Sequence, residues 1–292
     1  MGLAALLGPA QVEPFLATAW PHTPFVVHGA LARLKGLIAP KVTRDLDALF
    51  ELPAQKTFAQ LREGPRFSNA EVTLEVARAL HRTGVSIYRW EVELPSRGAQ
   101  QWLARLRRDL GLSDALPRVG LFASRKDVGA PLHFDGQESF VVQLAGRKEW
   151  TIASNHNVAF PTQNYVAADP LPPELHASWR GRAPTKIPSD ARRVVLEPGS
   201  VMFLPRGHWH ATRTLQDSVH FDLMLPLPTW KDLLIGQLTE QLAADPKWRA
   251  PAVDPALTPQ MLDALTDEVQ RYLERCQGAS GSTPASRKVS DK

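Results

Sequence analysis

Residues 131–140 have the sequence PLHFDGQESF, and they lie in the part of the chain whose pattern decides the fold. Between residues 118 and 226, short apolar runs alternate with Gly and Pro, as in RVGLFAS, FVVQLA, EWTIA, RRVVLE, VMFLP and SVHFDLML. Each run has the length and composition of a β-strand. Many short strands separated by turns predict a sandwich or a barrel. Within QLAGRKEW the pattern also predicts a hairpin that turns at Ala145-Gly146.

Helical patterns flank this strand-rich core on both sides. The pattern of residues 1–117 predicts a mixed α/β part that packs on the barrel. Within it we expect helices at AEVTLEVARALHR and GAQQWLARLRRDLGL, with a strand at GVSIYRWEVEL between them. The runs LARLKGLI and TWKDLLIGQLTEQLAA predict helices, and Thr258 predicts the N-cap of another. Residues 228–276 therefore predict a helical hairpin that packs on the barrel or pairs with a second subunit. Residues 277–292 predict a disordered tail.

Composition restricts the class of protein. Hydrophobic residues make up 43% of the 292 residues and charged residues 22%, which is typical of a globular protein. No apolar run of about 18 residues predicts a transmembrane helix, and the first residues lack the basic segment of a signal peptide. The single cysteine excludes an intramolecular disulfide and favours a reducing cytoplasm. The net charge of +4 comes from scattered residues, so nucleic acid is not directly indicated as a partner.

Two His-Phe-Asp triplets are the candidates for chemistry. They begin at His133 and at His220, and a His and an Asp two residues apart on a strand point to the same face. A catalytic metal needs a third ligand, and EPGSVMFLPRGHWH supplies His208 or His210. Two histidines and one carboxylate leave three octahedral positions open, as in non-haem Fe(II) oxygenases, whereas zinc more often takes a third His or Cys. The second triplet has a thinner polar context and predicts residues that line the barrel interior.

Residues 121–226 resemble the JmjC or cupin-like family of Fe(II)- and 2-oxoglutarate-dependent oxygenases. The resemblance rests on His133-x-Asp135, FVVQLAGRKEW and LEPGSVMFLPRGHWH, and it is densest over residues 118–226. Within the family the chain is most similar to the ribosomal oxygenases, through the QL-G-RK-W and LPRG--H patterns and FLATAWPHTPFVVHGAL near the N-terminus. The resemblance implies a mainly β fold with α additions, with residues 118–227 forming a double-stranded β-helix, or jelly-roll, core.

The resemblance also implies a role for individual residues. His133, Asp135 and His210 fall on the iron-ligand positions, with His208 as the alternative to His210. Lys148 falls where the family binds the distal carboxylate of 2-oxoglutarate, and an ammonium at the closed end of a barrel suits a dicarboxylate. The flanking positions of the cosubstrate correspond to Ser139, Asp222 and Phe122. The family often has Asn and Tyr where this chain has Gly120 and Phe122, and Phe122 lacks the hydroxyl that would donate to 2-oxoglutarate.

The implied activity is hydroxylation of an amino-acid side chain in a protein or peptide, with succinate and CO2 as co-products. A ribosomal protein is one candidate substrate, although we expect no winged-helix domain of the kind that ribosomal oxygenases carry after their helical segment. N-methyl-lysine demethylation uses the same chemistry and is the enzymatic alternative. A non-catalytic cupin-like binding module is the alternative from another class, favoured by Phe122 and the missing domain.

Overall fold

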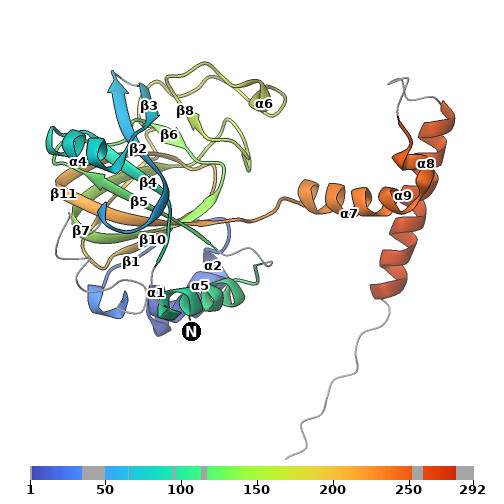
Figure 1. Cartoon of the computed structure of the whole chain (residues 1–292), viewed down its shortest axis with the longest axis horizontal. Coiled ribbons are helices and arrows are strands. Elements are labelled where there is room, and N and C mark those ends of the chain that lie inside the picture. Colours follow the sequence, from blue (N-terminus) through green and yellow to red (C-terminus); the bar gives the residue numbers. More distant parts are fainter. Residues whose placement is uncertain are drawn as a thin grey trace, which may run out of the picture. The chain divides into compact units, whose positions relative to one another are not determined.

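The computed structural model describes residues 2–34, 50–64, 66–94, 97–112, 117–251 and 259–280. The chain divides into two compact units, residues 1–227 and 228–292. Figure 1 shows the first unit as a strand-rich body with helices, and the second as helical. Each unit is therefore described separately.

The first unit contains a mainly antiparallel sheet that folds on itself. Its path runs β1 (Phe25–Val27), β10 (Val201–Leu204), β7 (Glu138–Ala153), β11 (Trp209–Leu225), β5 (Arg118–Ser124), β4 (Ser86–Val92), β2 (Ala54–Glu63) and β3 (Arg66–Glu71). Three further strands pair off this path, β6 (His133–Phe134), β8 (Tyr165–Val166) and β9 (Arg192–Leu196). The predicted β fold with α additions is confirmed.

The two longest strands, β7 and β11, pair along nearly their whole length, and β5, β6, β9 and β10 each pair with one of them. The hairpin predicted at Ala145-Gly146 is wrong, because β7 runs through these residues without reversing. Gly146 has φ +66°, and a Cβ there would lie 1.8 Å from the carbonyl oxygen of Asp217. The pairing with β11 is irregular between Thr214 and His220, so the strands bend here instead of turning back.

Helices cover one face of the sheet. The N-terminal helices α1 (Gly2–Leu7) and α2 (Pro9–Thr18) and the later α5 (Arg97–Asp109) contribute buried side chains to one hydrophobic core with the strands. Gly2 permits close packing, since a Cβ there would lie 2.2 Å from the backbone nitrogen of Leu106 on α5. Among the described residues before β4, a 3-10 turn at Leu31–Leu34 and α4 (Leu74–Arg82) are also helical. Of the run LARLKGLI, which predicted a helix, the structure describes only Leu31–Leu34, and these four residues form the 3-10 turn. The rest of the run lies outside the described residues.

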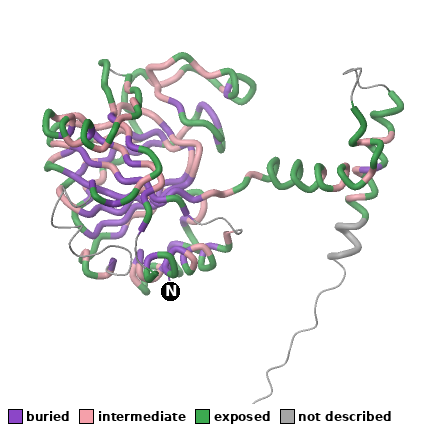
Figure 2. The backbone as a smooth tube through the Cα atoms, in the orientation of Figure 1, coloured by how far each residue is buried: buried purple, intermediate pink, exposed green. Residues whose placement is uncertain are grey.

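The period-2 alternation of strands separates this core from a cavity. On β7, Phe140 and Val142 point into the core with the helices, whereas Ser139 and Val141 line a cavity on the opposite face. Figure 2 shows the buried residues concentrated in these strands. The loop after β7, which contains β8 and the short helix α6 (Pro173–His176), contributes to the mouth of the same cavity. The hairpin of β2 and β3, which the sequence patterns did not predict, lines it as well.

The second unit contains α7 (Trp230–Ala244), α8 (Pro246–Arg249) and α9 (Pro259–Ser280). Thr229 and Asp232 form a capping box that begins α7, while Thr258 lies outside the described residues. Apolar side chains predicted to pack on one face remain exposed, among them Trp230, Leu234 and Leu262. Packing of these helices on the barrel and pairing with a second subunit both stay predictions. Among the described residues, no helix is long and apolar enough to cross a membrane.

Candidate active site

Three potential metal ligands converge at one end of the barrel. His133 on β6 and His210 on β11 are direct Cα partners in the β6–β11 pairing, and Asp135 follows β6 immediately. Their ligand atoms all lie within 4.8 Å of one another. The rings of the two histidines are 4.0 Å apart, and Nε2 of His210 lies 3.5 Å from Oδ2 of Asp135. In the described part of the chain, this is the one His, Cys, Asp and Glu cluster with ligand spacing.

The hydrogen bonds of the two histidines direct the correct nitrogen into the site. Nδ1 of His133 lies 2.7 Å from the carbonyl oxygen of Pro131, and Nδ1 of His210 lies 2.9 Å from that of His208. Because a carbonyl oxygen only accepts, each Nδ1 must carry the proton and donate it. Nε2 of each ring is then the nitrogen that points into the site and can bind a cation once it carries no proton, and the carbonyls fix the ring orientation.

Electrostatics favour the same protonation state. Burial, and next the neighbouring His133, lower the pKa of His210 to about 3, although Asp135 opposes this shift. His210 is therefore neutral at any physiological pH, and a metal need not displace a proton from it. Two imidazoles and one carboxylate form a donor set that fits a divalent transition metal.

His208, the alternative ligand, lies elsewhere. It precedes β11 and lines a separate cavity with His22 and Phe160, so it does not join His133 and Asp135. β11 begins only at Trp209, so His208 is not on the strand that carries His210. Of the two histidines, His210 is the one that completes the triad.

A cavity of about 270 Å³ extends from the triad into the barrel. All seven residues that the sequence analysis selected line it: His133, Asp135, His210, Lys148, Ser139, Asp222 and Phe122. Other residues that the sequence pattern did not indicate complete the cavity, notably Tyr88, Trp150 and Phe67 of the β2–β3 hairpin. The ring of Phe67 packs edge-on against that of His133, 5.7 Å away.

Lys148 is a buried cation within this cavity. Its side chain comes from β7 opposite Thr214 of β11, it is 5% exposed, and Nζ lies 3.5 Å from Oγ of Ser124. Among the described residues it forms no ion pair. Burial lowers the pKa of Lys148 to about 8, and the charge of Asp222 works in the opposite direction. A buried ammonium with one long, neutral hydrogen bond is suited to receive an anion.

Asp222 and His220 line the cavity from β11, the strand paired with β7. Burial, and next the charge of Asp135, raise the pKa of Asp222 to about 7, against the effect of Lys148 and of a hydrogen bond from Ser139. Oδ1 of Asp222, Nδ1 of His220 and Nε1 of Trp150 are buried and lack hydrogen-bond partners among the described residues. Buried polar atoms are nearly always paired, so these three atoms fit a cavity that holds a polar ligand.

Phe122 lies in the middle of a stack of three rings. Its ring is 4.2 Å from that of Tyr88 at 13° and 5.0 Å from that of His220 at 4°. Tyr88 occupies space that Gly120 leaves open, since a Cβ on Gly120 would lie 2.9 Å from Cε2 and 3.4 Å from the hydroxyl of Tyr88. Among the described residues, the one hydrogen-bond acceptor of that hydroxyl is Sδ of Met224, at the long distance of 3.9 Å. Tyr88 therefore brings a weakly bonded hydroxyl to the cavity beside Phe122.

Comparison with known proteins agrees with this geometry. Residues 99–233 match the model of the JmjC domain family. The chain is 26% identical over 280 residues to the uncharacterized protein YxbC of Bacillus subtilis, covering 93% of this chain and 84% of that protein. It is 29% identical over 209 residues to human ribosomal oxygenase 1, covering 68% of this chain and 30% of the relative. A protein of Drosophila willistoni named bifunctional lysine-specific demethylase and histidyl-hydroxylase NO66 is 27% identical over 38% of this chain and 12% of that protein.

Solved structures support the fold. YcfD, a ribosomal oxygenase from Escherichia coli solved in complex with cobalt and 2-oxoglutarate, superposes with a TM-score of 0.55 at 18% identity. The match covers 89% of this chain and 66% of that chain. The chain thus spans about two thirds of the length of YcfD and less than a third of human ribosomal oxygenase 1. The likeness to YcfD confirms the predicted jelly-roll fold.

Proposed function

We propose, from the match of residues 99–233 to the JmjC domain family, that this chain is an Fe(II)- and 2-oxoglutarate-dependent oxygenase that hydroxylates an amino-acid side chain of a protein or peptide. The observation that carries the proposal is one cavity that contains both a metal-ligand triad and a buried lysine. A metal site alone would fit many activities. A buried ammonium in the same cavity adds a receptor for an anionic cosubstrate.

In this proposal His133, Asp135 and His210 hold Fe(II) through Nε2 of each ring and the Asp135 carboxylate. When bound there, Fe(II) and 2-oxoglutarate would allow O2 to hydroxylate an unactivated C–H bond. One oxygen atom would enter the substrate and the other would enter succinate, which forms from 2-oxoglutarate with release of CO2. The carbonyls of Pro131 and His208 hold the imidazoles in one orientation. The chain contributes ligand geometry and a shaped, largely dry pocket.

Lys148 binds the distal carboxylate of 2-oxoglutarate by a charge-assisted hydrogen bond, with Ser124 as its neighbour. The rings of Phe122 and Trp150 exclude water from this end of the cavity. Phe122 cannot donate a hydrogen bond, so the hydroxyl of Tyr88 takes that role. Burial, and next the charge of Asp222, raise the pKa of Tyr88, so the hydroxyl keeps its proton and remains a donor. Ser139 on β7 and Asp222 on β11 flank the cosubstrate.

The mouth of the cavity suits a polypeptide. Four carboxamides line it, those of Gln60, Asn69, Gln137 and Asn164. Carboxamides both donate and accept hydrogen bonds, as an extended peptide backbone requires. A ribosomal protein is the substrate we propose to test first, because the relatives that match this chain include ribosomal oxygenases.

Demethylation of N-methyl-lysine is a second candidate. The sequence offered no aromatic cage for a methylated ammonium, but the cavity is lined by Tyr88, Trp90 and Tyr165 besides Phe67. Aromatic faces attract such cations. Hydroxylation leaves a product with one added oxygen, whereas demethylation releases formaldehyde. The mass of the product peptide therefore separates the two reactions.

The cofactor proposal can be tested before the substrate is known. Titration of the protein with Fe(II) and 2-oxoglutarate without oxygen should produce the visible charge-transfer band of the bidentate chelate. His210→Ala should abolish the band and Lys148→Ala should weaken it. His208→Ala is the matched control, because His208 is a neighbouring histidine outside the triad, and it should retain the band. Iron binding without a band would instead favour the non-catalytic binding module.

A further inference from the structure

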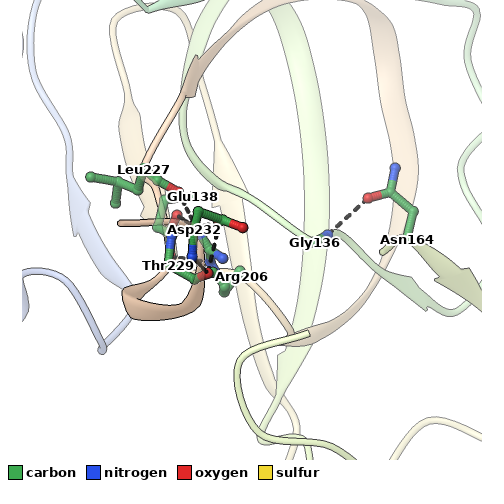
Figure 3. A network of polar contacts seen from close by, with 7 residues as sticks. All are labelled: Gly136, Glu138, Asn164, Arg206, Leu227, Thr229 and Asp232. Carbon is green, nitrogen blue, oxygen red and sulfur yellow. Dashed lines mark hydrogen bonds and ion pairs between the residues drawn. The ribbon is translucent and has the colours of Figure 1, made fainter. Parts of the chain in front are cut away.

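Arg206 and Glu138 form a buried ion pair beside the proposed metal centre. Nε and Nη2 of Arg206 donate to the two carboxylate oxygens of Glu138 at 2.6 and 2.7 Å, and Nη2 also donates to the carbonyl of Leu227 at 3.1 Å (Figure 3). The side chains are 9% and 7% exposed. In every other ion pair of the described residues, at least one side chain is about a third exposed or more.

The pair joins the two segments that carry the ligands. Glu138 begins β7, three residues after Asp135, and Arg206 lies in the turn between β10 and β11, four residues before His210. A bidentate Arg–carboxylate contact fixes an angle as well as a distance. The contact therefore restrains the turn at 205–208 relative to residues 135–138.

Of the three ligands, Asp135 depends most on such a restraint. His133 and His210 are held by the strand pairing of β6 and β11, but β6 ends at Phe134. Asp135 is instead placed by its surroundings. Its carbonyl accepts from the backbone N–H of Gly207 at 2.8 Å, beside Arg206.

Two further hydrogen bonds hold Gly136, which follows Asp135, and Gly207 in place. The N–H of Gly136 donates to Oδ1 of Asn164 at 2.8 Å, as Figure 3 shows, and the carbonyl of Gly207 accepts from Nδ2 of Asn155 at 2.8 Å. The Arg206–Glu138 contact is the charged member of this set of bonds. It ties Arg206, the neighbour of Gly207, to Glu138, the first residue of β7.

We propose that Arg206 and Glu138 are positioning residues for the metal centre, which hold the Asp135 carboxylate within reach of the cation bound by His133 and His210. This inference rests on the proposed function. Stability alone explains the pair poorly, because buried ion pairs can often be replaced by apolar side chains without loss of stability. A positioning role instead predicts an effect on metal affinity in a protein that is still folded.

The test measures metal affinity directly, without turnover. Mn(II) is titrated into the full chain, and the EPR signal of the free ion gives the bound fraction. His210→Ala defines binding outside the triad. Arg206→Lys keeps the charge but loses the bidentate geometry, and Glu138→Met/Arg206→Met removes both charges while keeping apolar volume. Arg147→Met is the matched control, because it breaks an exposed Arg–Glu pair, Arg147–Glu197 at 3.0 Å.

We expect Arg206→Lys and the double variant to bind Mn(II) roughly tenfold more weakly than the wild type, the lower end of the effect of residues that orient metal ligands. Arg147→Met should stay within about twofold. Near-UV circular dichroism at the titration temperature confirms that each variant is folded. Wild-type affinity in both folded variants would overturn the positioning role and leave the proposed function intact. A wild type that binds no more Mn(II) than His210→Ala would overturn both.

Discussion

Replacing Lys148 by Met should strengthen the fold and weaken cosubstrate binding at the same time. The Lys148 ammonium is buried, and its pKa is lowered from 10.5 to about 8, mainly by burial. About 1.4 kcal/mol corresponds to each tenfold change in an ionisation constant, so keeping this cation in the folded chain near pH 7 costs about 3 kcal/mol. Met has a similar length and no charge. Removal of Lys148 leaves no unpaired anion, because Asp222, with a pKa of about 7, can take a proton.

We therefore expect Lys148→Met to raise the unfolding free energy by about 3 kcal/mol at neutral pH without cosubstrate, and the Tm by roughly 5–10 °C. The gain should shrink as the pH rises from about 8 to 10.5. In that window the folded wild type loses the Lys148 proton while the unfolded chain retains it, so the cost of burying the cation disappears. Differential scanning calorimetry at several pH values measures both effects.

Cosubstrate binding should change in the opposite direction. Loss of a charge-assisted hydrogen bond of about 1.5–3 kcal/mol predicts binding of 2-oxoglutarate that is about 10- to 150-fold weaker, measured by anaerobic calorimetric titration of the metal-loaded protein. Lys56→Met is the control, because Lys56 forms an exposed pair with Glu71 at 3.0 Å and should change neither quantity appreciably. A destabilised Lys148→Met variant that binds 2-oxoglutarate normally would refute the reasoning, since Lys148 would then support the fold and not the ligand.

Four further outcomes are expected. The affinity for 2-oxoglutarate should fall roughly tenfold between about pH 7 and 9, because Lys148 loses its charge near pH 8, and a flat calorimetric profile would contradict this. Tyr88→Phe should weaken 2-oxoglutarate binding about three- to tenfold in the same titration, and an unchanged affinity would exclude its hydroxyl as a donor. Gly207→Ala should lower the unfolding free energy by about 1–3 kcal/mol in urea, because Gly207 has φ +82° and a Cβ would lie 2.7 Å from Cδ of Pro161. Light scattering should give twice the chain mass if the exposed apolar residues of α7 and α9 pair between subunits, and Leu234→Glu should then restore a monomer.

The residues selected from the sequence lie in one cavity, whereas the path of the chain was predicted less well. His133 and Asp135 were selected because a strand places alternate residues on one face, but β6 ends at Phe134, and Asp135 follows it. The choice between His208 and His210 depended on where β11 begins, and strand ends are the least certain feature of a pattern. The resemblance pointed to His210, and the geometry agrees.

Contacts between distant segments could not be predicted from one sequence. The strand containing Tyr88 was recognised, but nothing in SIYRW shows that β4 pairs with β5 and stacks Tyr88 on Phe122. The bend of β7 at Gly146 looked like a hairpin, because Ala-Gly is typical of a turn. Only the approach of Asp217 on β11 shows that glycine is needed there for a close contact. The hairpin of β2 and β3 carries mostly polar side chains and lacked an apolar alternation.

The two ends of the cavity differ in how freely they can change during evolution. Ser139 and Lys148 lie on one long strand, and His210 and Asp222 lie on its partner. Lys148 lies an odd number of positions after Ser139, and both line the cavity because the pairing of β7 with β11 is irregular near Gly146, so the facing of these four residues depends on that register. Inserting a single residue would reverse the facing of every later side chain, so this end should tolerate almost no length variation. The mouth is built from a hairpin and loops, which accept insertions and substitutions at low cost. Descendants of such a protein could therefore acquire new acceptors while keeping the same cosubstrate.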